Sequence, residues 1–506
     1  MPQDFAATAQ IAYLRWLASE DHAAQTLLRT VREYAGGQQP TYLTDRQKEF
    51  IGLKKATAAY LYKHNLCQLV IDTLAERLSV EGFAPTRKRA RAEATDGGPT
   101  TIEEWASEWW EANRADALQD DVHETAIRDG AVYLIVDWDG DEGRPRWSLN
   151  LAFDGTTGVR VYQDANTNAM LFAAKRWQVY DPIATENNGR TRVTLYYPDR
   201  VEKYISAKDA NQGIGGTQWE AYRDAEQEPW PIPWTDATGK PLGCAVIEFA
   251  NPCGSEITQL MPLQDMLNKA DLDLIACTDS AGFRILYAAG LAKVIGSDGN
   301  EVPITLSPGH MIRMESPDAK LGAIEPTDPK LLIESCKYWI ESVAGVSRTP
   351  QYLFQVPGGT PPSGESLKQQ ETGLIHKAER RQRVFGNSWE DVIYLSAKLH
   401  NLYLPGQVVD IERLSVEWAS AQEFADPLGE DQAEALIVKT NVEAGIPLIT
   451  ALRQRGWDDE QIAALQAELA AQQQAQQQSL AAAMLEMERR ADRGESPAVA
   501  PEGLEA

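Results

Sequence analysis

The chain has 506 residues, of which 43% are hydrophobic and 24% charged, and its formal net charge is −26. This length allows roughly two to four domains, and the composition is typical of a globular protein with a sizeable core. Such acidity argues against a protein that grips nucleic acid over a broad face, because Lys and Arg are needed there to displace counterions. It does not exclude a protein past which nucleic acid slides.

The first 80 residues predict helices. Residues 1–40 have a helical pattern, and residues 42–80 continue it with apolar side chains at helical spacing. The stretch RLSVEGFAP then breaks the pattern. A basic run follows at Arg87, Lys88, Arg89 and Arg91, among polar, Gly- and Pro-bearing neighbours. This composition favours an exposed loop, and a phosphate contact is the functional alternative.

Residues 101–128 again predict a helix, in which Trp105, Trp109 and Trp110 lie close together. Packing in the core or at a subunit interface is the favoured role of these three indoles. The functional alternative is a platform on which bases stack.

Residues 131–153 predict two strands about a turn. The turn sequence DWDGDEG is rich in carboxylates, but it lacks the glycine position and the terminal glutamate of an EF-hand loop. Asp-Gly hairpin chemistry therefore explains it better than a calcium site. More strands are expected at 170–180, 192–198 and 201–206 and in CAVIEFANP, and the first α+β region ends near residue 241.

Two helices enclose a short strand-like region in the middle of the chain. Residues 261–281 have a helical pattern, and residues 282–327 predict a compact β-rich insertion with Gly, Pro and Asp at its joints. Asp328 and Pro329 then suit the N-cap and first position of the next helix, and Gly345 suits its end.

A Gly- and Pro-rich loop, VPGGTPPSGESLKQQ, follows this second helix. The capping-box pattern Ser366-Leu-Lys-Gln369 predicts that a very long helix starts there and runs to about Leu402. A basic cluster on this helix comprises Lys377, Arg380, Arg381 and Arg383. It fits either a salt-bridge face between subunits or a contact with DNA.

The C-terminal part changes character. Residues 431–455 are Ala-rich and helical in pattern, and residues 459–491 are dominated by Ala, Gln and Leu, which are good helix formers. The tail GESPAVAPEGLEA is predicted to be disordered.

The sequence carries no recognisable catalytic motif. The Gly-rich loop is not a P-loop, because Gly364 is followed by Glu365 where that motif has Lys and then Ser or Thr. No HExxH or GxSxG occurs, and the six histidines show no metal-ligand spacing. We therefore expect no enzyme, no cofactor and no metal site.

Two further features bear on where the protein is found. Five cysteines are scattered without a CxxC motif, which indicates free thiols in a reducing compartment. The N-terminus has no basic region followed by an apolar run, and no apolar stretch approaches the length that spans a bilayer. We expect a soluble protein that is intracellular when made.

The order of parts resembles that of the portal (head-to-tail connector) proteins of tailed bacteriophages, of the long-tailed siphovirus type. Residues 64–83 look like the N-terminal helix of that family, and residues 251–274 look like the entry to its first stem helix. The most specific stretch is 347–392, in which a Pro-containing turn, a loop and Ser-Gly-Glu-x-Leu-Lys lead into the long helix. The likeness covers roughly residues 40–460, and none of its motifs is catalytic.

The resemblance implies an α+β portal fold with a wing, a helical stem, a small β-rich clip, a long wing helix and an α-helical crown. Its expected parts are the wing 1–250, the stem helix 251–281, the clip 282–327, the second stem helix 328–346, the tunnel loop 347–365, the long helix and rest of the wing 366–424, the crown 425–491 and the disordered tail 492–506.

The resemblance also assigns site residues. The tunnel loop would face DNA with Gln355, Val356, Gly358, Gly359, Thr360 and Ser363. The stem would line the channel with Lys269, Asp271 and Asp273. The clip would dock partners through Arg284, Lys293, Asp298 and Arg313, and the basic cluster at Lys377, Arg380, Arg381 and Arg383 could contact DNA.

A portal is a ring, usually of twelve subunits, at one vertex of the virion capsid, and it assembles in the host cytoplasm. The implied partners are the terminase large subunit, the major capsid and scaffold proteins, head-completion proteins, and double-stranded DNA that passes without sequence specificity. A wall of carboxylates would discourage DNA from sticking, so lysines at Asp271 and Asp273 should slow packaging. Two alternatives stay open: a metal-dependent nucleic-acid-processing enzyme, and a capsid-associated structural protein that forms no channel.

Overall fold

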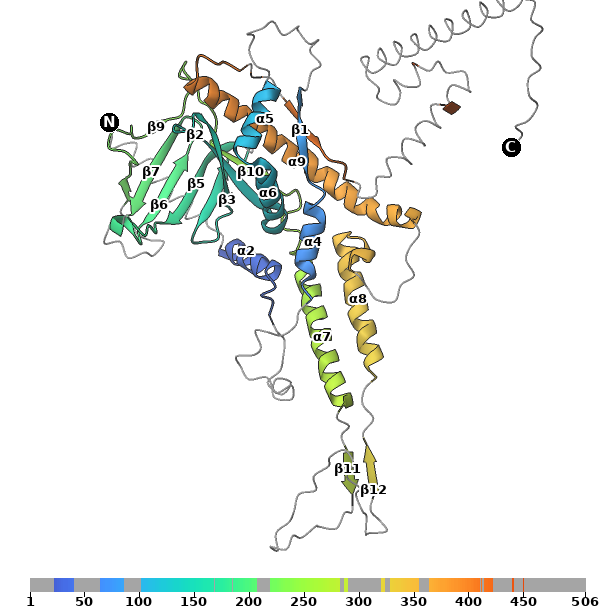
Figure 1. Ribbon diagram of the computed structural model, residues 1–506. Coiled ribbons are helices and arrows are strands. Elements are labelled where there is room, and N and C mark those ends of the chain that lie inside the picture. Colours follow the sequence, from blue (N-terminus) through green and yellow to red (C-terminus); the bar gives the residue numbers. More distant parts are fainter. Residues whose placement is uncertain are drawn as a thin grey trace, which may run out of the picture. The chain divides into compact units, whose positions relative to one another are not determined.

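The computed structural model describes residues 22–40, 64–85, 102–167, 169–183, 185–206, 219–282, 286–289, 320–323, 328–354, 364–409, 411, 414–421, 439–440 and 449. Contacts divide the chain into two units, residues 1–423 and 424–506. In the second unit the described residues 439, 440 and 449 are helical. The first unit mixes helices and strands, which confirms the predicted α+β class (Figure 1).

The helices of the first unit include two long ones that frame its functional end. Their bounds are α2 His22–Ala35, α4 Leu66–Ala75, α5 Ile102–Ala112, α6 Ala115–Asp129, α7 Met261–Gly282, α8 Pro329–Ser347 and α9 Gly364–Tyr403, with 3-10 turns η2 Thr185–Asn187 and η3 Gln351–Phe354. The helix α9 therefore begins two residues before the predicted capping box and ends one residue beyond the predicted end.

The strands form four antiparallel groups. Their bounds are β1 Val80–Pro85, β2 Ala131–Asp139, β3 Arg144–Leu151, β4 Gly158–Gln163, β5 Met170–Gln178, β6 Thr191–Tyr196, β7 Arg200–Ser206, β8 Trp219–Ala221, β9 Ile232–Pro233, β10 Val246–Ala250, β11 Leu286–Ala289, β12 Lys320–Ala323 and β13 Leu414–Trp418. The largest sheet has the order β4-β5-β6-β7-β8 with β9 beside β7, and a second sheet has the order β10-β2-β3. The pairs β1–β13 and β11–β12 stand apart from both sheets.

The turn between β2 and β3 confirms the predicted hairpin. The sequence DWDGDEG lies at its tip, where Asp139 Oδ1 accepts hydrogen bonds from the backbone N–H groups of Asp141 and Glu142 at 3.1 and 3.2 Å. These bonds hold the chain in a tight reversal, as is usual for Asp in turns.

Aromatic side chains form the centre of the core around α9. Trp389 and Phe385 of α9 are fully buried, and Trp389 packs edge-on against Phe249 of β10 and Trp110 of α5. Trp109 and Trp110 are 2% and 8% exposed. Core packing is therefore confirmed for these two indoles, and the alternative of a base-stacking platform does not fit their burial.

Three local predictions were wrong. The predicted helix 101–128 is two helices, because the chain turns at Arg114, whose φ of 52° is left-handed. The stretch VEGFAP does not merely end a helix but forms β1, which pairs with β13 more than 300 residues later. The helix α8 does not end at Gly345 but continues to Ser347, and Arg348 takes the left-handed cap position.

Candidate functional site

The helices α7 and α8 pack side by side as an antiparallel pair, and the strands β11 and β12 lie between them in the sequence and pair with each other (Figure 1). The start of α8 confirms the predicted cap: Asp328 Oδ1 accepts a hydrogen bond from the N–H of Lys330 at 3.0 Å, with Pro329 at the first helical position. We call α7 and α8 the hairpin.

Buried amide side chains hold the root of the hairpin. Gln264 of α7 is fully buried, and its Oε1 accepts the N–H of Leu66 at 3.0 Å while its Nε2 donates to the carbonyl oxygen of His64. Gln264 also donates to Asn268 Oδ1 at 3.0 Å, and Asn268 donates to Gln39 Oε1 at 2.6 Å. Because these groups are satisfied only by one another, the root of α7 is fixed to the start of α4 and to the segment after α2.

Asp271 continues this buried stripe one turn further along α7. Its residue is 8% exposed, and its Oδ2 lies 2.9 Å from Nδ1 of His64. This hydrogen bond raises the pKa of His64 above its ordinary value, against the opposing effect of burial. The thiol of Cys336 on α8 donates to Asp271, and burial together with that carboxylate raises the pKa of Cys336 to about 12. Asp271 therefore faces its own chain.

The opposite side of α7 is exposed. Lys269 Nζ and Asp273 Oδ2 form an ion pair at 3.1 Å with side chains 51% and 32% exposed, and Met266 is 47% exposed. The predicted channel-lining set is thus divided, with Lys269 and Asp273 accessible and Asp271 turned inward. Channel lining stays a prediction for the accessible pair, whereas Asp271 is occupied within the chain.

A buried ion pair ties α9 to the hairpin. Glu256, just before α7, accepts from Lys377 Nζ at 2.8 Å and from Arg381, and these three side chains are 9%, 11% and 2% exposed. Lys377 also donates to the carbonyl oxygen of Ser347 at the end of α8, at 2.8 Å. Burial opposes ionisation of Glu256, but the two cations outweigh it and hold its pKa below the ordinary value.

The predicted basic cluster on α9 is therefore divided as well. Lys377 and Arg381 serve the buried pair with Glu256, whereas Arg380 and Arg383 are exposed. Arg380 approaches only the Sγ of Cys253, at 3.7 Å, among the described residues. A contact with DNA or with a neighbouring subunit stays a prediction for Arg380 and Arg383.

A second buried cluster joins the residues on either side of the 355–363 segment. Glu371 is 2% exposed and accepts a hydrogen bond from the hydroxyl of Tyr352 in η3. Its Oε1 also lies 3.2 Å from Nη2 of Arg77, whose other nitrogen donates to the carbonyl oxygen of Ala421 at 2.8 Å. The two ends of this segment are thus held together and fixed to the end of α4.

Several predicted site residues lie outside the described residues. These are the tunnel-loop residues Gln355, Val356, Gly358, Gly359, Thr360 and Ser363, the clip residues Arg284, Lys293, Asp298 and Arg313, and the basic run at 87–91. Their roles stay predictions.

Sequence reasoning missed the buried polar residues that fix the hairpin. Gln264, Asn268 and Asp271 recur at i, i+4 and i+7 along α7, which puts them on one side of the helix. That spacing was a usable signal, because polar side chains on a side flanked by Leu267 and Leu274 indicate a satisfied network. Glu256 and Glu371 gave no comparable signal, since their partners are distant in the sequence.

Within the described residues, no group of three or more His, Cys, Asp or Glu side chains is arranged to hold a metal ion. None of the described helices is long and apolar enough to cross a membrane. No disulfide joins the five cysteines, all of which the structure describes.

Comparison with known proteins gives consistent matches. A family model described as "Phage portal protein, SPP1 Gp6-like" matches residues 53–477. A protein of Mycobacterium phage D29 named "Portal protein" is 21% identical over 466 residues, and one of Mycobacterium phage L5 with the same name is 20% identical over 462 residues. Each alignment covers 83% of this chain and 84% of the relative.

One solved structure was also matched. A chain of "Neck of empty GTA particle computed with C6 symmetry" has a TM-score of 0.36 and 13% identity to this chain, and the match covers 75% of this chain and 89% of that one.

Proposed function

Because this chain belongs to the SPP1 Gp6-like family of phage portal proteins, we propose that copies of it form a ring around a channel at one capsid vertex, through which DNA is packaged and ejected. The match spans residues 53–477, most of the chain, and it is the observation that carries the proposal. A ring of twelve subunits is the expected number.

The hairpin of α7 and α8 forms the channel wall in this proposal. It is a rigid support for such a wall, because Gln264 and Asn268 lock its root and the Glu256 cluster locks its other helix to α9. The segment between the two helices, with β11 and β12, is the clip that docks the terminase large subunit and then the head-completion proteins. Arg284, Lys293, Asp298 and Arg313 are its proposed docking residues.

The segment 355–363 is the proposed tunnel loop, which reaches toward DNA in the channel. The Tyr352–Glu371–Arg77 cluster supports this assignment, because it fixes both ends of the segment to the body of the subunit. The glycines permit the loop to change shape as DNA passes, and the prolines limit its range. The lack of a lysine suits a loop that touches a polyanion without holding it.

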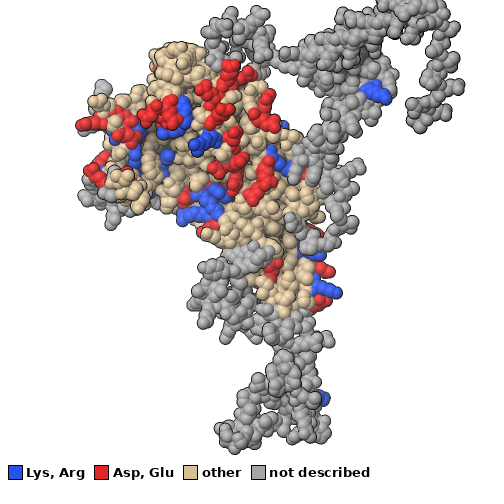
Figure 2. Space-filling model, in the orientation of Figure 1, with Lys and Arg blue, Asp and Glu red and all other residues tan. Residues whose placement is uncertain are grey.

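The remaining parts are assigned as in the family. Residues 1–250 and 366–424 form the wing, residues 425–491 the crown and residues 492–506 the tail, and the major capsid and scaffold proteins are partners of the assembled ring. Asp and Glu side chains dominate the middle of the surface in Figure 2, which suits a protein that DNA should not coat. The protein would act as a conduit, with ATP hydrolysis and DNA cutting supplied by the terminase.

Native mass spectrometry of the purified full chain, with negative-stain images of the same sample, tests the proposal. Rings with a central hole are expected, at about twelve times the 56.0 kDa of one chain. A species that stays monomeric in the presence of scaffold and capsid proteins, and that shows metal-dependent nuclease activity, would favour the alternative of a nucleic-acid-processing enzyme.

A further inference from the structure

We propose that the hairpins of neighbouring subunits pack edge to edge, with the outer edge of α7 in one copy against the outer edge of α8 in the next. This inference rests on the proposed ring and adds which side chains build it. The occupant of both edges is a second copy of this chain.

The two edges lie on opposite sides of the hairpin. Asp271 and Cys336 are hydrogen-bonded, so they mark the sides by which α7 and α8 face each other. Lys269 and Asp273 each lie two residues from Asp271, which is about 160° around a helix. Glu334 and Tyr338 lie two residues from Cys336 and are likewise about 160° away. Each helix therefore turns one exposed stripe away from its partner.

Both stripes carry exposed apolar side chains. On α8, Leu331 is 65% exposed and Tyr338 is 60% exposed, and on α7 Met266 is 47% exposed. Large apolar side chains that gather on one edge at helical spacing, rather than singly, are typical of an interaction surface. A ring needs two different complementary surfaces on each subunit, because its contacts are heterologous.

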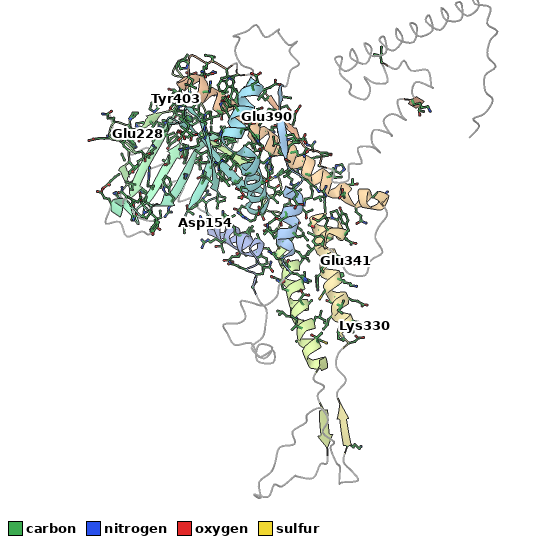
Figure 3. The ribbon with its side chains drawn as sticks, viewed as in Figure 1. Asp154, Glu228, Lys330, Glu341, Glu390 and Tyr403 are labelled. Atoms are coloured by element: carbon green, nitrogen blue, oxygen red, sulfur yellow. The ribbon has the colours of Figure 1, made fainter. Side chains whose placement is uncertain are left out.

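The edge of α8 also carries charges of both signs. These are Lys330, Glu334, Lys337 and Glu341, and none of them forms an ion pair with any residue that the structure describes. Figure 3 shows Lys330 and Glu341 along α8, and Figure 2 shows positive and negative side chains together at this edge of the hairpin. Unpaired charges of alternating sign suit a partner edge with its own alternation, and α7 offers Lys269 and Asp273.

Cyclic symmetry fixes the register between the two edges. Neighbouring hairpins in a ring stand at the same height, so the level relation within one hairpin holds between copies when the hairpin runs along the ring axis. Because Asp271 is level with Cys336 and the helices are antiparallel, Lys269 is level with Tyr338, and Asp273 with Glu334.

Side-chain direction then selects the ion pairs. Side chains lean toward the N-terminus of their helix, so those of α7 and those of α8 lean in opposite directions and converge on partners about one turn apart. Lys269 thereby meets Glu341 of the next copy, and Asp273 meets Lys337. Tyr338 packs against the stem of Lys269, where its ring face attracts the ammonium group.

Charge-swapped variants of the full chain test this contact. K269E/D273K reverses the α7 edge and K337E/E341K reverses the α8 edge, and each variant keeps the net charge of the chain. Native mass spectrometry should show loss of the ring and a gain of monomer in each, because like charges then face each other at every interface. The four substitutions together should restore the ring. E226K, at an exposed position in the loop after β8, is the control and should leave the ring intact.

Cross-linking supplies an independent measurement. In a C253S background, K269C/E341C treated with a short bis-maleimide should give a ladder of covalent multimers, and either cysteine alone should give none. A link within one chain is excluded by the opposite directions of the two stripes. Rings that form without the ladder, or that survive both swaps, would overturn this interface and leave the portal proposal standing. A wild-type chain that forms no ring would instead overturn the portal proposal itself.

Discussion

The indole Nε1–H of Trp389 donates a hydrogen bond to Nε2 of His123 at 3.0 Å. On its other side, Nδ1 of His123 lies 2.8 Å from the carbonyl oxygen of Leu78, which can only accept. The imidazole is therefore neutral, with its proton on Nδ1. Both side chains are fully buried, and the bonds join α6 to α9 and to the segment after α4. Burial lowers the pKa of His123 to about 4, although the bond to Leu78 favours the charged form.

We expect this histidine to make stability depend on pH. The unfolded chain takes up the proton near pH 6.5, whereas the folded chain resists it down to about pH 4. The contribution is therefore fully present above pH 6.5 and is lost as the pH falls toward 4. The free energy of unfolding should drop by about 3 kcal/mol over that range from this group alone. Urea denaturation at a series of pH values measures it.

His123→Gln isolates the effect, because glutamine does not titrate and can still donate and accept hydrogen bonds. Its unfolding free energy should be lower at pH 7 but should fall less steeply between pH 6.5 and 4. Parallel curves for the two proteins would show that His123 does not carry the dependence.

Glu256→Gln should be among the most destabilising single substitutions in the first unit. It leaves the charges of Lys377 and Arg381 buried without a carboxylate, and breaking such a pair costs about 3–5 kcal/mol. Since the pKa of Glu256 is lowered, the stability it contributes is present above its unfolded pKa and is lost as the pH falls through the folded pKa. Thermal denaturation beside Glu226→Gln, an exposed control, measures the difference. Equal melting temperatures would contradict the assignment.

Tyr352→Phe should lower stability by about 2 kcal/mol, because it removes a hydrogen bond to the buried carboxylate of Glu371. Arg77 keeps Glu371 paired, so the variant should still fold. The matched control is Tyr180→Phe, whose ring is 86% exposed and should matter little. Similar unfolding free energies for the two variants would mean that the Tyr352 hydroxyl does not hold this cluster.

Local patterns predicted the elements whose signals are local. The hairpin of β2 and β3 and the start of α8 at Asp328 followed from turn and cap chemistry within a few residues. The pairing of β1 with β13 could not be predicted, because Gly82 and its partner Glu417 lie in stretches that carry no mark of each other. The break at Arg114 was missed for a related reason: no Gly or Pro announces it, and tertiary packing holds the left-handed conformation.

The candidate site shows the same division. Helical spacing placed Lys269 and Asp273 on one stripe, and both are exposed. It could not say which stripe of α7 the rest of the chain would cover, so Asp271 was assigned with them. The identity of its neighbours, His64 and Cys336, depends on contacts across 207 and 65 residues.

Asp271→Lys and Asp273→Lys make the same change of charge two residues apart, and we expect opposite outcomes. At Asp271 the ammonium group would be buried beside His64, whose pKa is already raised and which would lose its acceptor. An unpaired buried charge should cost about 3–5 kcal/mol and loosen the root of the hairpin. At Asp273 the side chain is 32% exposed, and the change should stay within about 0.5 kcal/mol.

Limited proteolysis and thermal melting of the two purified variants separate these outcomes. If both melt like the parent chain, the burial of Asp271 does not matter to the fold. If the expected difference holds, a packaging defect of Asp271→Lys reports a damaged subunit. Only Asp273→Lys then tests what the outer edge of α7 meets, because its subunit keeps the parent fold while its exposed charge is reversed.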